Sequence, residues 1–405
     1  MIICKEDACT GCMACISVCA KSAVTIVYDN AGFAHPQISE AKCVGCKRCQ
    51  QICPVINQNK NKTIGQIYAA WQKNESERLA ATSGGVFTII AKKFIEDGGV
   101  VYGAAFDEDN VVKHIRADTM TDLLCIRGSK YVQSDTSAVY ERVAYDLKSG
   151  TRVLFSGTPC QVSALKSYTK HQVDLFCIDI VCHGVPSPRV FKDYIENLNY
   201  KYHSKAEKIN FRFKSPGWSV FSMLIQFQNG AEYISSKFKD PYLGLFLAEG
   251  DLTLRESCFQ CKFTSPERCG DITLGDFWCI RAKQWKQRGV EKGVNLVVIN
   301  NQKGDMLFDS IKSRLYCERH NWIEALGSNQ SFKMPWKKPI LYDQFWKDYD
   351  NFSFDEMTEK YHKYDEMAEA KQVQEAHKRA TEYIVPLPVR MSLKVFRKIW
   401  GILVK

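Results

Sequence analysis

The stretch "KCVGCKRCQQICP" at residues 42–54 decides how this sequence is interpreted, because four cysteines follow one another at short, regular intervals. The stretch "ACTGCMACISVCA" at 8–20 repeats the spacing. C-x2-C-x2-C-x3-C is the spacing of bacterial 4Fe–4S sites, in which the fourth cysteine of each run binds the other cluster. A zinc site, which usually pairs C-x2-C with a distant second pair, does not explain it. The predicted ligands of one cluster are Cys9, Cys12, Cys15 and Cys53, and those of the other are Cys43, Cys46, Cys49 and Cys19.

Composition sets the broader class. The chain has 405 residues, 18 cysteines and a formal net charge of +10, enough length for two or three domains. The start "MIICKEDAC" lacks the basic and apolar regions of a secretory signal, so we expect a cytoplasmic protein, in which clustered cysteines indicate metal or redox chemistry. The positive net charge either only keeps the protein soluble or also attracts an acidic electron carrier such as a small ferredoxin. No basic run interleaved with aromatics is present, so we expect no nucleic-acid partner.

The remaining sequence predicts an α+β protein: a small bacterial-type ferredoxin domain at 1–56, a polar linker at 57–66 and then a mixed α/β domain. Residues 67–205 alternate helices with strands, such as those at 100–106, 152–157 and 174–182. Thr82 or Ser83 is expected to cap the helix that follows. Residues 206–335 are richer in β-strands, and residues 336–405 are a charged, helical tail. Cys4, Cys125, Cys177 and Cys317 are expected to be packing residues.

Small residues collect in the loops "TSGGVF" (82–87), "RGSKYVQS" (127–134), "SGTPCQ" (156–161) and "VCHGVPSP" (181–188). No G-x-G-x-x-G or Walker A pattern is present, so the common nucleotide fingerprints do not apply. In an open α/β sheet, however, ligands bind where strands end and helix N-termini begin. Ser83, Gly84 and Gly85 are candidates to hold a phosphate or a flat ring, and Lys130 to neutralise a pyrophosphate or a reduced flavin.

These loops, together with "LRESCFQCKF" (254–263) and "DITLGDFW" (271–278), resemble the coenzyme F420 hydrogenase/dehydrogenase beta-subunit family from about residue 66 to 330. The resemblance implies a flavoprotein that binds FAD, with a 4Fe–4S cluster beside it. The implied cofactor-binding residues are Ser83, Gly84, Gly85, Ser129, Lys130, Tyr131, Gly157, Thr158, Pro159 and Gln161. The implied ligands of this third cluster are Cys160, Cys182, Cys258 and Cys261.

Several alternatives stay open at this point. Cys258 and Cys261 also suit a structural zinc pair, and either Cys269 or Cys279 is positioned to replace one of the cluster ligands. His183 is a candidate catalytic residue, with Lys130, but a purely structural role explains it as well. Asp276 suits either substrate orientation or a turn. The last residues, "SLKVFRKIWGILVK", have an apolar and a basic face that suit a membrane surface or a partner protein equally.

The function expected from these features is electron transfer between a ferredoxin-type carrier and an organic substrate or a deazaflavin coenzyme, through 4Fe–4S clusters and FAD. The alternative is an electron-transfer subunit of a larger hydrogenase or dehydrogenase complex, with no substrate of its own. The sequence does not identify the substrate or the direction of electron flow.

Overall fold

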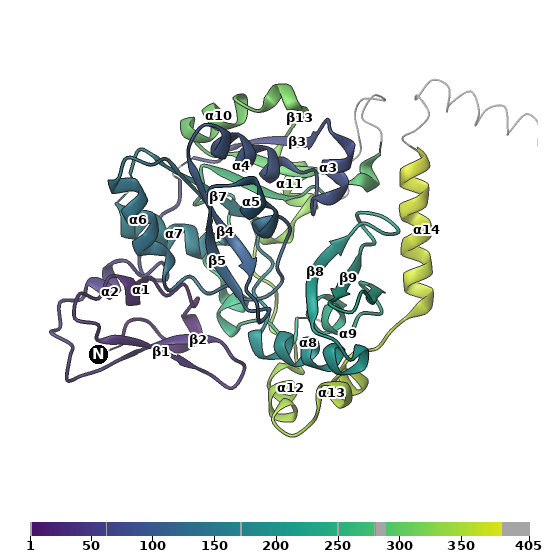
Figure 1. The fold of residues 1–405 in the computed structure, drawn as a ribbon, viewed down its shortest axis with the longest axis horizontal. Coiled ribbons are helices and arrows are strands. Elements are labelled where there is room, and N and C mark those ends of the chain that lie inside the picture. Colours follow the sequence, from purple (N-terminus) through teal and green to yellow (C-terminus); the bar gives the residue numbers. More distant parts are fainter. Residues whose placement is uncertain are drawn as a thin grey trace, which may run out of the picture.

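The computed structural model describes residues 2–61, 63–170, 172–248, 251–278, 280 and 289–382. Its first part is a small module of short elements, which Figure 1 draws in purple at one side of the molecule. These are η1 (Glu6–Ala8), α1 (Ala14–Ser17), β1 (Val24–Tyr28), β2 (Ala34–Ile38) and α2 (Arg48–Gln51). Each cysteine run enters its one-turn helix through a left-handed residue, Met13 at φ 55° and Lys47 at φ 59°. The two runs therefore fold alike, as their equal spacing predicts.

An eight-stranded sheet forms the centre of the molecule, in the order β13-β3-β12-β11-β7-β6-β4-β5. Strands β4, β6, β7 and β11 are parallel to one another, and antiparallel strands complete both sides. The strands are β3 (Gln66–Gln72), β4 (Val100–Phe106), β5 (Val112–Ala117), β6 (Val153–Gly157), β7 (Leu175–Ile180), β11 (Ile272–Asp276), β12 (Asn295–Ile299) and β13 (Leu315–His320). Because β6, β7 and β11 run in one direction, the loops that follow them meet at one edge.

Helices cover both faces of this sheet because successive side chains of a strand point to opposite sides. On one face, α4, α5 and α10 pack against residues such as Leu154. On the other face, α6 and α7 pack against Val153 and Phe155, and Cys12 and Ile52 of the N-terminal module join this cluster. The helices of this part are α3 (Glu75–Ala80), α4 (Val86–Glu96), α5 (Met120–Ile126), α6 (Val139–Lys148), α7 (Pro159–Thr169), α10 (Gln302–Asp309) and α11 (Trp322–Ser328).

The expected capping of α4 is wrong. Gly85 is the N-cap residue, in a left-handed conformation at φ 82°, and the first N–H of the helix, that of Val86, donates to the Asn295 side chain instead. A left-handed residue turns the chain sharply into the helix at little cost only when it is glycine. The Ser83 hydroxyl is thereby left buried and without a hydrogen-bond partner.

A three-stranded antiparallel sheet, β10-β9-β8, stands beside the large one. Its strands are β8 (Ala206–Phe213), β9 (Ser222–Phe227) and β10 (Glu232–Ser236), and it packs against α8 (Pro188–Tyr202), α12 (Tyr342–Tyr349) and α13 (Phe354–Tyr361) in the largest apolar cluster. The β8–β9 register shifts between Asn210 and Phe213, so that both Phe211 and Arg212 are buried. The fold class predicted from the sequence, a ferredoxin module followed by a mixed α/β domain with further β-structure, is confirmed.

The remaining short elements are α9 (Pro241–Leu243), η2 (Gly244–Ala248), η3 (Glu256–Gln260), η4 (Val290–Lys292), η5 (Lys312–Arg314) and η6 (Gln330–Phe332). The last described element is the longer helix α14 (Glu366–Glu382). Within the described residues, none of the helices has the length and apolar character to cross a bilayer. The amphipathic segment 392–405 and Cys279 lie outside the described residues.

The predicted linker is held against the large domain by hydrogen bonds at residues 57–61. Asn59 bonds to Ser163 and Ser167, and Asn61 bonds to the carbonyls of Arg268 and Gly270. The domain boundaries themselves remain predictions.

Candidate functional site

The eight cysteines of the N-terminal module form two neighbourhoods. Burial, together with the nearby Cys9, Cys53 and Cys49, raises the pKa of the Cys15 thiol to about 12. Burial also raises the pKa of Cys49, and there the cysteine neighbours are Cys46 and Cys19. Cys53 thus neighbours the first run and Cys19 the second, and the crossed ligand sets remain a prediction: an inner group of Cys9, Cys12, Cys15 and Cys53 and an outer group of Cys19, Cys43, Cys46 and Cys49.

The four cysteines expected to be packing residues differ in their burial. Cys4 is only half-buried and packs against the apolar cluster that contains Cys15, Cys49 and Cys53. Cys125 is exposed on α5, because Leu123 and Ile126 occupy the buried side of that short helix. Cys177 is buried, and Cys317 is half-buried against the core, as expected of packing residues.

A buried arginine fastens the module to the large domain. Arg255 is 2% exposed, and its Nε donates to the Cys9 carbonyl at 2.6 Å. Its two terminal nitrogens donate to the Ala34 carbonyl at 3.0 Å and to the Gln133 side chain at 2.9 Å. Gln133 in turn donates to the carbonyls of Thr10 and Gly11. One guanidinium therefore fixes the first cysteine loop and the β1–β2 hairpin against the rest of the protein.

The four cysteines proposed for a third cluster gather next to that interface. Burial raises the pKa of the Cys182 thiol, and Cys258, Cys160 and Cys261 raise it further. Burial likewise raises the pKa of Cys160 to about 11, while the nearby Thr10 of the module lowers it. Cys160 is also an electrostatic neighbour of Cys12. The third group thus adjoins the inner group of the module.

Cys269 lies apart from these four thiols. Its backbone N–H donates to the Asp179 carboxylate, and its main electrostatic neighbours are Asp179 and Arg268 rather than other cysteines. No three histidine, cysteine or acidic side chains in the described parts of the chain converge as tightly as one metal ion requires. A four-iron cluster has its thiolates at separate corners and does not require that closeness.

A cavity of about 1150 Å³ opens where β6, β7 and β11 end. Its wall includes eight of the ten residues that the family resemblance implies for the cofactor: Ser83, Gly85, Ser129, Lys130, Tyr131, Gly157, Thr158 and Gln161. Gly84 and Pro159 are not in this wall. A Cβ on Gly84 would lie 2.4 Å from the Ala70 carbonyl oxygen, so packing against β3 accounts for that glycine. Pro159 is the buried first residue of α7. Cys182 and His183 also line the cavity.

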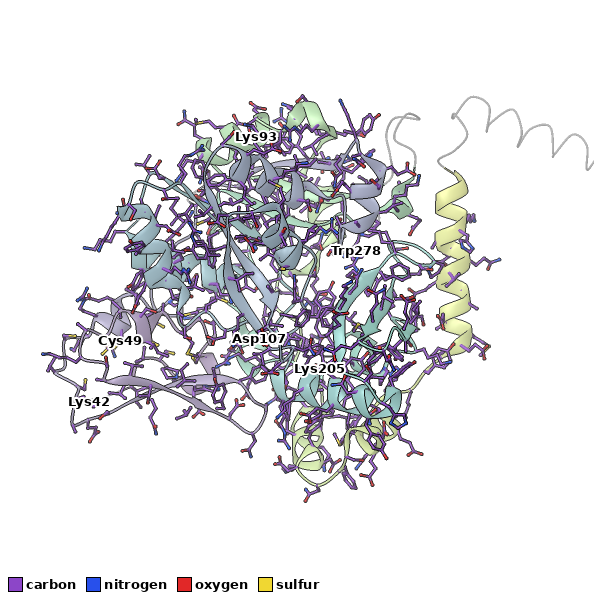
Figure 2. All side chains as sticks on the ribbon, viewed as in Figure 1. Lys42, Cys49, Lys93, Asp107, Lys205 and Trp278 are labelled. Atoms are coloured by element: carbon purple, nitrogen blue, oxygen red, sulfur yellow. The ribbon has the colours of Figure 1, made fainter. Side chains whose placement is uncertain are left out.

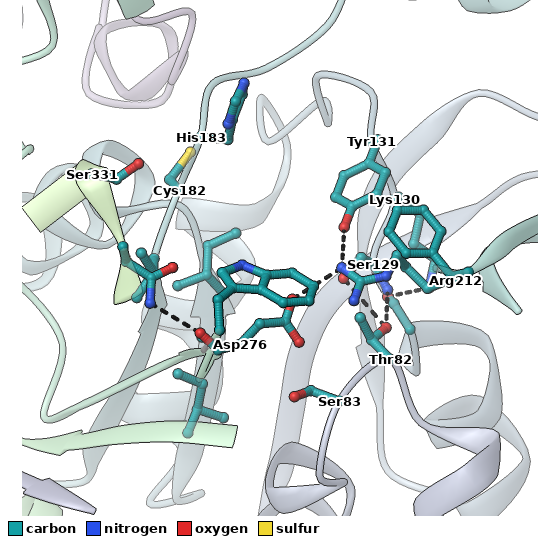
Figure 3. Close-up of a pocket in the computed structure, with 18 of the residues that line it drawn as sticks. Thr82, Ser83, Ser129, Lys130, Tyr131, Cys182, His183, Arg212, Asp276 and Ser331 are labelled. Carbon is teal, nitrogen blue, oxygen red and sulfur yellow. Dashed lines mark hydrogen bonds and ion pairs between the residues drawn. The ribbon is translucent and has the colours of Figure 1, made fainter. Parts of the chain in front are cut away.

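The cavity fits an anionic group at the start of α4. The Ser83 hydroxyl is buried in its wall without a partner, close to the first N–H groups of the helix. Such N–H groups and a free hydroxyl are donors suited to phosphate oxygens. Thr82 accepts a hydrogen bond from the Ser129 N–H at 2.9 Å, which holds the two loops together (Figure 3). The residues present are therefore compatible with the pyrophosphate of a flavin dinucleotide.

Lys130 bonds within its own loop. Its Nζ donates to the carbonyls of Cys125 and Arg127 at 2.8 and 2.9 Å, and burial lowers its pKa to about 7. Lys214 instead joins three distant segments, since its Nζ donates to the carbonyls of Arg78, Ser83 and Lys292. Burial lowers its pKa to about 7 as well. Both lysines hold loops of the cavity in place; the catalytic role of Lys130 remains a prediction.

Arg212 is the charged group that sequence reasoning missed. It is 4% exposed, and its Nη1 donates to Asp276 and to the Tyr131 hydroxyl, both at 2.9 Å (Figure 3). Its guanidinium lies 4.1 Å from the ring centroid of Phe221. Asp276 also accepts from the Trp218 indole at 2.8 Å. The Asp276 carboxylate therefore holds Arg212 in the cavity wall, whereas the predicted orientation of a substrate by Asp276 remains open.

His183 has partners on both sides. Its Nε2 lies 2.5 Å from Asp251 Oδ1, and its ring lies 4.5 Å from that of Trp336. The Trp336 N–H is buried in the cavity wall and has no partner. The carboxylate orients the imidazole beside Cys182, which is compatible with either proton transfer or a structural role.

Comparison with known proteins agrees with these features. Residues 150–324 match the family described as the C terminus of the coenzyme F420 hydrogenase/dehydrogenase beta subunit. Residues 8–57 match a 4Fe–4S dicluster domain. The resemblance read from the loop motifs is therefore confirmed, and the chain is an iron–sulfur electron-transfer protein related to F420 hydrogenase beta subunits.

Among solved structures, a chain of the F420-reducing [NiFe] hydrogenase complex from Methanosarcina barkeri is similar, with 15% identity and a TM-score of 0.41. The similarity covers 68% of this chain and 89% of that one. No curated protein sequence matches the chain.

Proposed function

We propose that the protein is an iron–sulfur flavoprotein oxidoreductase. It exchanges electrons with a ferredoxin-type carrier and transfers them to, or accepts them from, an organic substrate or a deazaflavin coenzyme. The observation that carries the proposal is the position of Cys160, Cys182, Cys258 and Cys261, whose thiols gather between the dicluster module and the large cavity.

The order of the thiolate groups in space supports one path. The group of Cys19 and Cys49 neighbours the group of Cys15, which neighbours Cys160 through Cys12. Cys182, in the same group as Cys160, lies in the cavity wall. Cofactors held by these groups would form a continuous row that ends at the cavity.

The chain's own residues would place and shield the cofactors. Ser83 and the N-terminus of α4 would bind the pyrophosphate, while the loops fixed by Lys130 and Lys214 would hold the flavin in place. A bound flavin would supply the exchange between single electrons and electron pairs. Arg212, kept charged by Asp276, would face an anionic part of the flavin or substrate, and His183 would hold a proton near Cys182.

Anaerobic purification followed by iron, sulfide and flavin quantitation tests the proposal. We expect about twelve irons and one FAD per chain, four irons for each of three clusters. The double variant Cys258→Ser/Cys261→Ser should lose about four irons and keep the eight of the module. Eight irons in the unaltered protein, or the absence of flavin, would contradict the proposal.

The alternative is an electron-transfer subunit of a larger complex without its own substrate. The description of the matched family as a beta subunit favours it. Isolation from the native organism under anaerobic conditions separates the two: a stable complex that transfers electrons only as a whole supports the subunit, and turnover by the single chain supports the enzyme.

A further inference from the structure

The outer cysteine group is open to solvent. Of the twelve predicted cluster ligands, all within the described residues, only Cys46 is exposed. A Cβ built on the neighbouring Gly45 would meet no atom within 4 Å, so nothing covers this loop. The inner ligands Cys9, Cys12 and Cys15 are all buried. Because electron transfer slows steeply with distance, a protein carrier reaches this chain of clusters most directly at the outer group.

Positive charge surrounds the exposed cysteine. Lys21 follows Cys19, and Lys42, Lys47 and Arg48 surround Cys43 and Cys46 in sequence; all four cations are exposed. None of these four has an ion-pair partner among the residues that the structure describes, and the loop 39–48 contains one acid, Glu40. Figure 2 shows Lys42 at the outer end of the module, on the side away from the eight-stranded sheet.

Apolar side chains lie within this ring of charge. Val44, between two cluster cysteines, is 65% exposed. Ile2 is 76% exposed, and its carbonyl accepts a hydrogen bond from Gln50, the neighbour of Cys49, at 2.8 Å. An apolar centre with a charged rim is the usual anatomy of a protein–protein contact. Complementary charge in such a contact raises the association rate more than the affinity, which suits a carrier that must leave again.

We propose that the surface formed by Lys21, Lys42, Val44, Lys47 and Arg48, the outer-cluster surface, is the docking site of an acidic one-electron carrier protein of the ferredoxin type. The inference rests on the proposed function and adds the place of contact and the charge of the partner. In the step itself, one electron leaves the reduced carrier and is accepted at the outer group; no bond forms and no proton moves. A second copy of the chain does not suit this surface, since each copy carries +10.

Charge reversal tests the surface. We would compare the triple variant Lys21→Glu/Lys42→Glu/Lys47→Glu with the control triple Lys92→Glu/Lys208→Glu/Lys239→Glu, whose lysines are also exposed but lie outside the module. Both change the net charge equally. Arg48 is left in place because it begins α2, next to Cys49. The probe is a reduced, acidic plant-type [2Fe–2S] ferredoxin, with cluster reduction followed by stopped-flow absorbance.

We expect the second-order rate constant to fall at least about tenfold more in the surface triple than in the control at low ionic strength. The difference should vanish near about 0.5 M salt, where charges are screened. With a basic cytochrome c as acceptor from the reduced protein, the surface triple should react faster than the control. The neutral triple with glutamine at the same three positions should lie between the unaltered protein and the glutamate triple.

Equal rate constants in the two glutamate triples would overturn the inference. So would the finding that the unaltered protein is a dimer and that the surface triple is a monomer. Iron and sulfide contents of each variant separate these outcomes from failure of the proposed function. Protein with its full iron content but equal rates refutes only the surface, whereas unaltered protein without clusters refutes the proposed function.

Discussion

Replacement of Arg255 by methionine should release the N-terminal module from the large domain. The guanidinium makes two buried hydrogen bonds across the interface, to the carbonyls of Cys9 and Ala34, and a third to Gln133 of its own domain. A hydrogen bond to a charged group contributes about 1.5–3 kcal/mol, and the two that cross the interface share one side chain, so we expect a loss of about 3 kcal/mol in docking free energy. This corresponds to an increase of about a hundredfold in the population of the undocked module.

Hydrogen exchange measured by mass spectrometry on the cluster-loaded protein reports this opening. Peptides covering 9–15 and 130–136 should exchange about a hundredfold faster in Arg255→Met, while peptides from β4 should not change. The matched control is Lys262→Ala, because Lys262 is exposed and makes one interface hydrogen bond, to the Val55 carbonyl at 3.1 Å. This control should change exchange by less than about fivefold. Equal exchange in the two variants would refute the reasoning.

Three further variants test the cavity wall. Asp276→Asn leaves Arg212 buried without its counter-charge and should lower the unfolding free energy by about 3 kcal/mol, measured by calorimetry. The control Trp218→Phe removes one hydrogen bond to the same carboxylate and should lower the unfolding free energy by about 1 kcal/mol. Equal losses in the two variants would contradict the role of the ion pair. Ser83→Ala should leave thermal unfolding of the flavin-free protein unchanged but weaken FAD binding about threefold to tenfold by fluorescence titration, and unchanged affinity would exclude this hydroxyl from the site. Burial lowers the pKa of Lys214 to about 7, so the unfolded chain binds more protons than the folded one from about pH 7 to 10. Stability should therefore rise with pH across that window, and the rise should diminish in Lys214→Met; the same slope in both proteins would argue against the lowered pKa.

Local patterns in the sequence predicted most of the elements around the site. The apolar runs at 100–106 and 152–157 coincide with β4 and closely with β6, because buried parallel strands are short, continuous and apolar. The equal spacing of the two cysteine runs predicted that they fold alike, each with a left-handed residue before a one-turn helix, while the crossed ligand sets remain a prediction. The helix after Ser83 was predicted, but its cap was not, because the side chain that accepts from its first N–H, Asn295, lies 209 residues later in the sequence.

Arg212 escaped prediction because β8 does not alternate regularly. Strict alternation places Arg212 opposite Phe211 and Phe213, facing solvent, but the register shift between Asn210 and Phe213 turns it inward. A bulge of this kind depends on the partner strand and leaves no local signal. Arg255 was missed for a related reason: its three acceptors come from three distant segments, which the fold alone brings together.

The order of strands in the large sheet has a consequence for how the protein is made. β3 follows directly after the N-terminal module, yet it pairs with β12 and β13, more than 220 residues later in the chain. During synthesis, the eight cysteines of the module leave the ribosome early, so that iron can be inserted there while β3 still waits for its neighbours. The four cysteines at the cavity become complete only at Cys261, and the sheet closes later still. Maturation of this protein should therefore proceed in two stages, through a partly folded chain that carries only the clusters of the module.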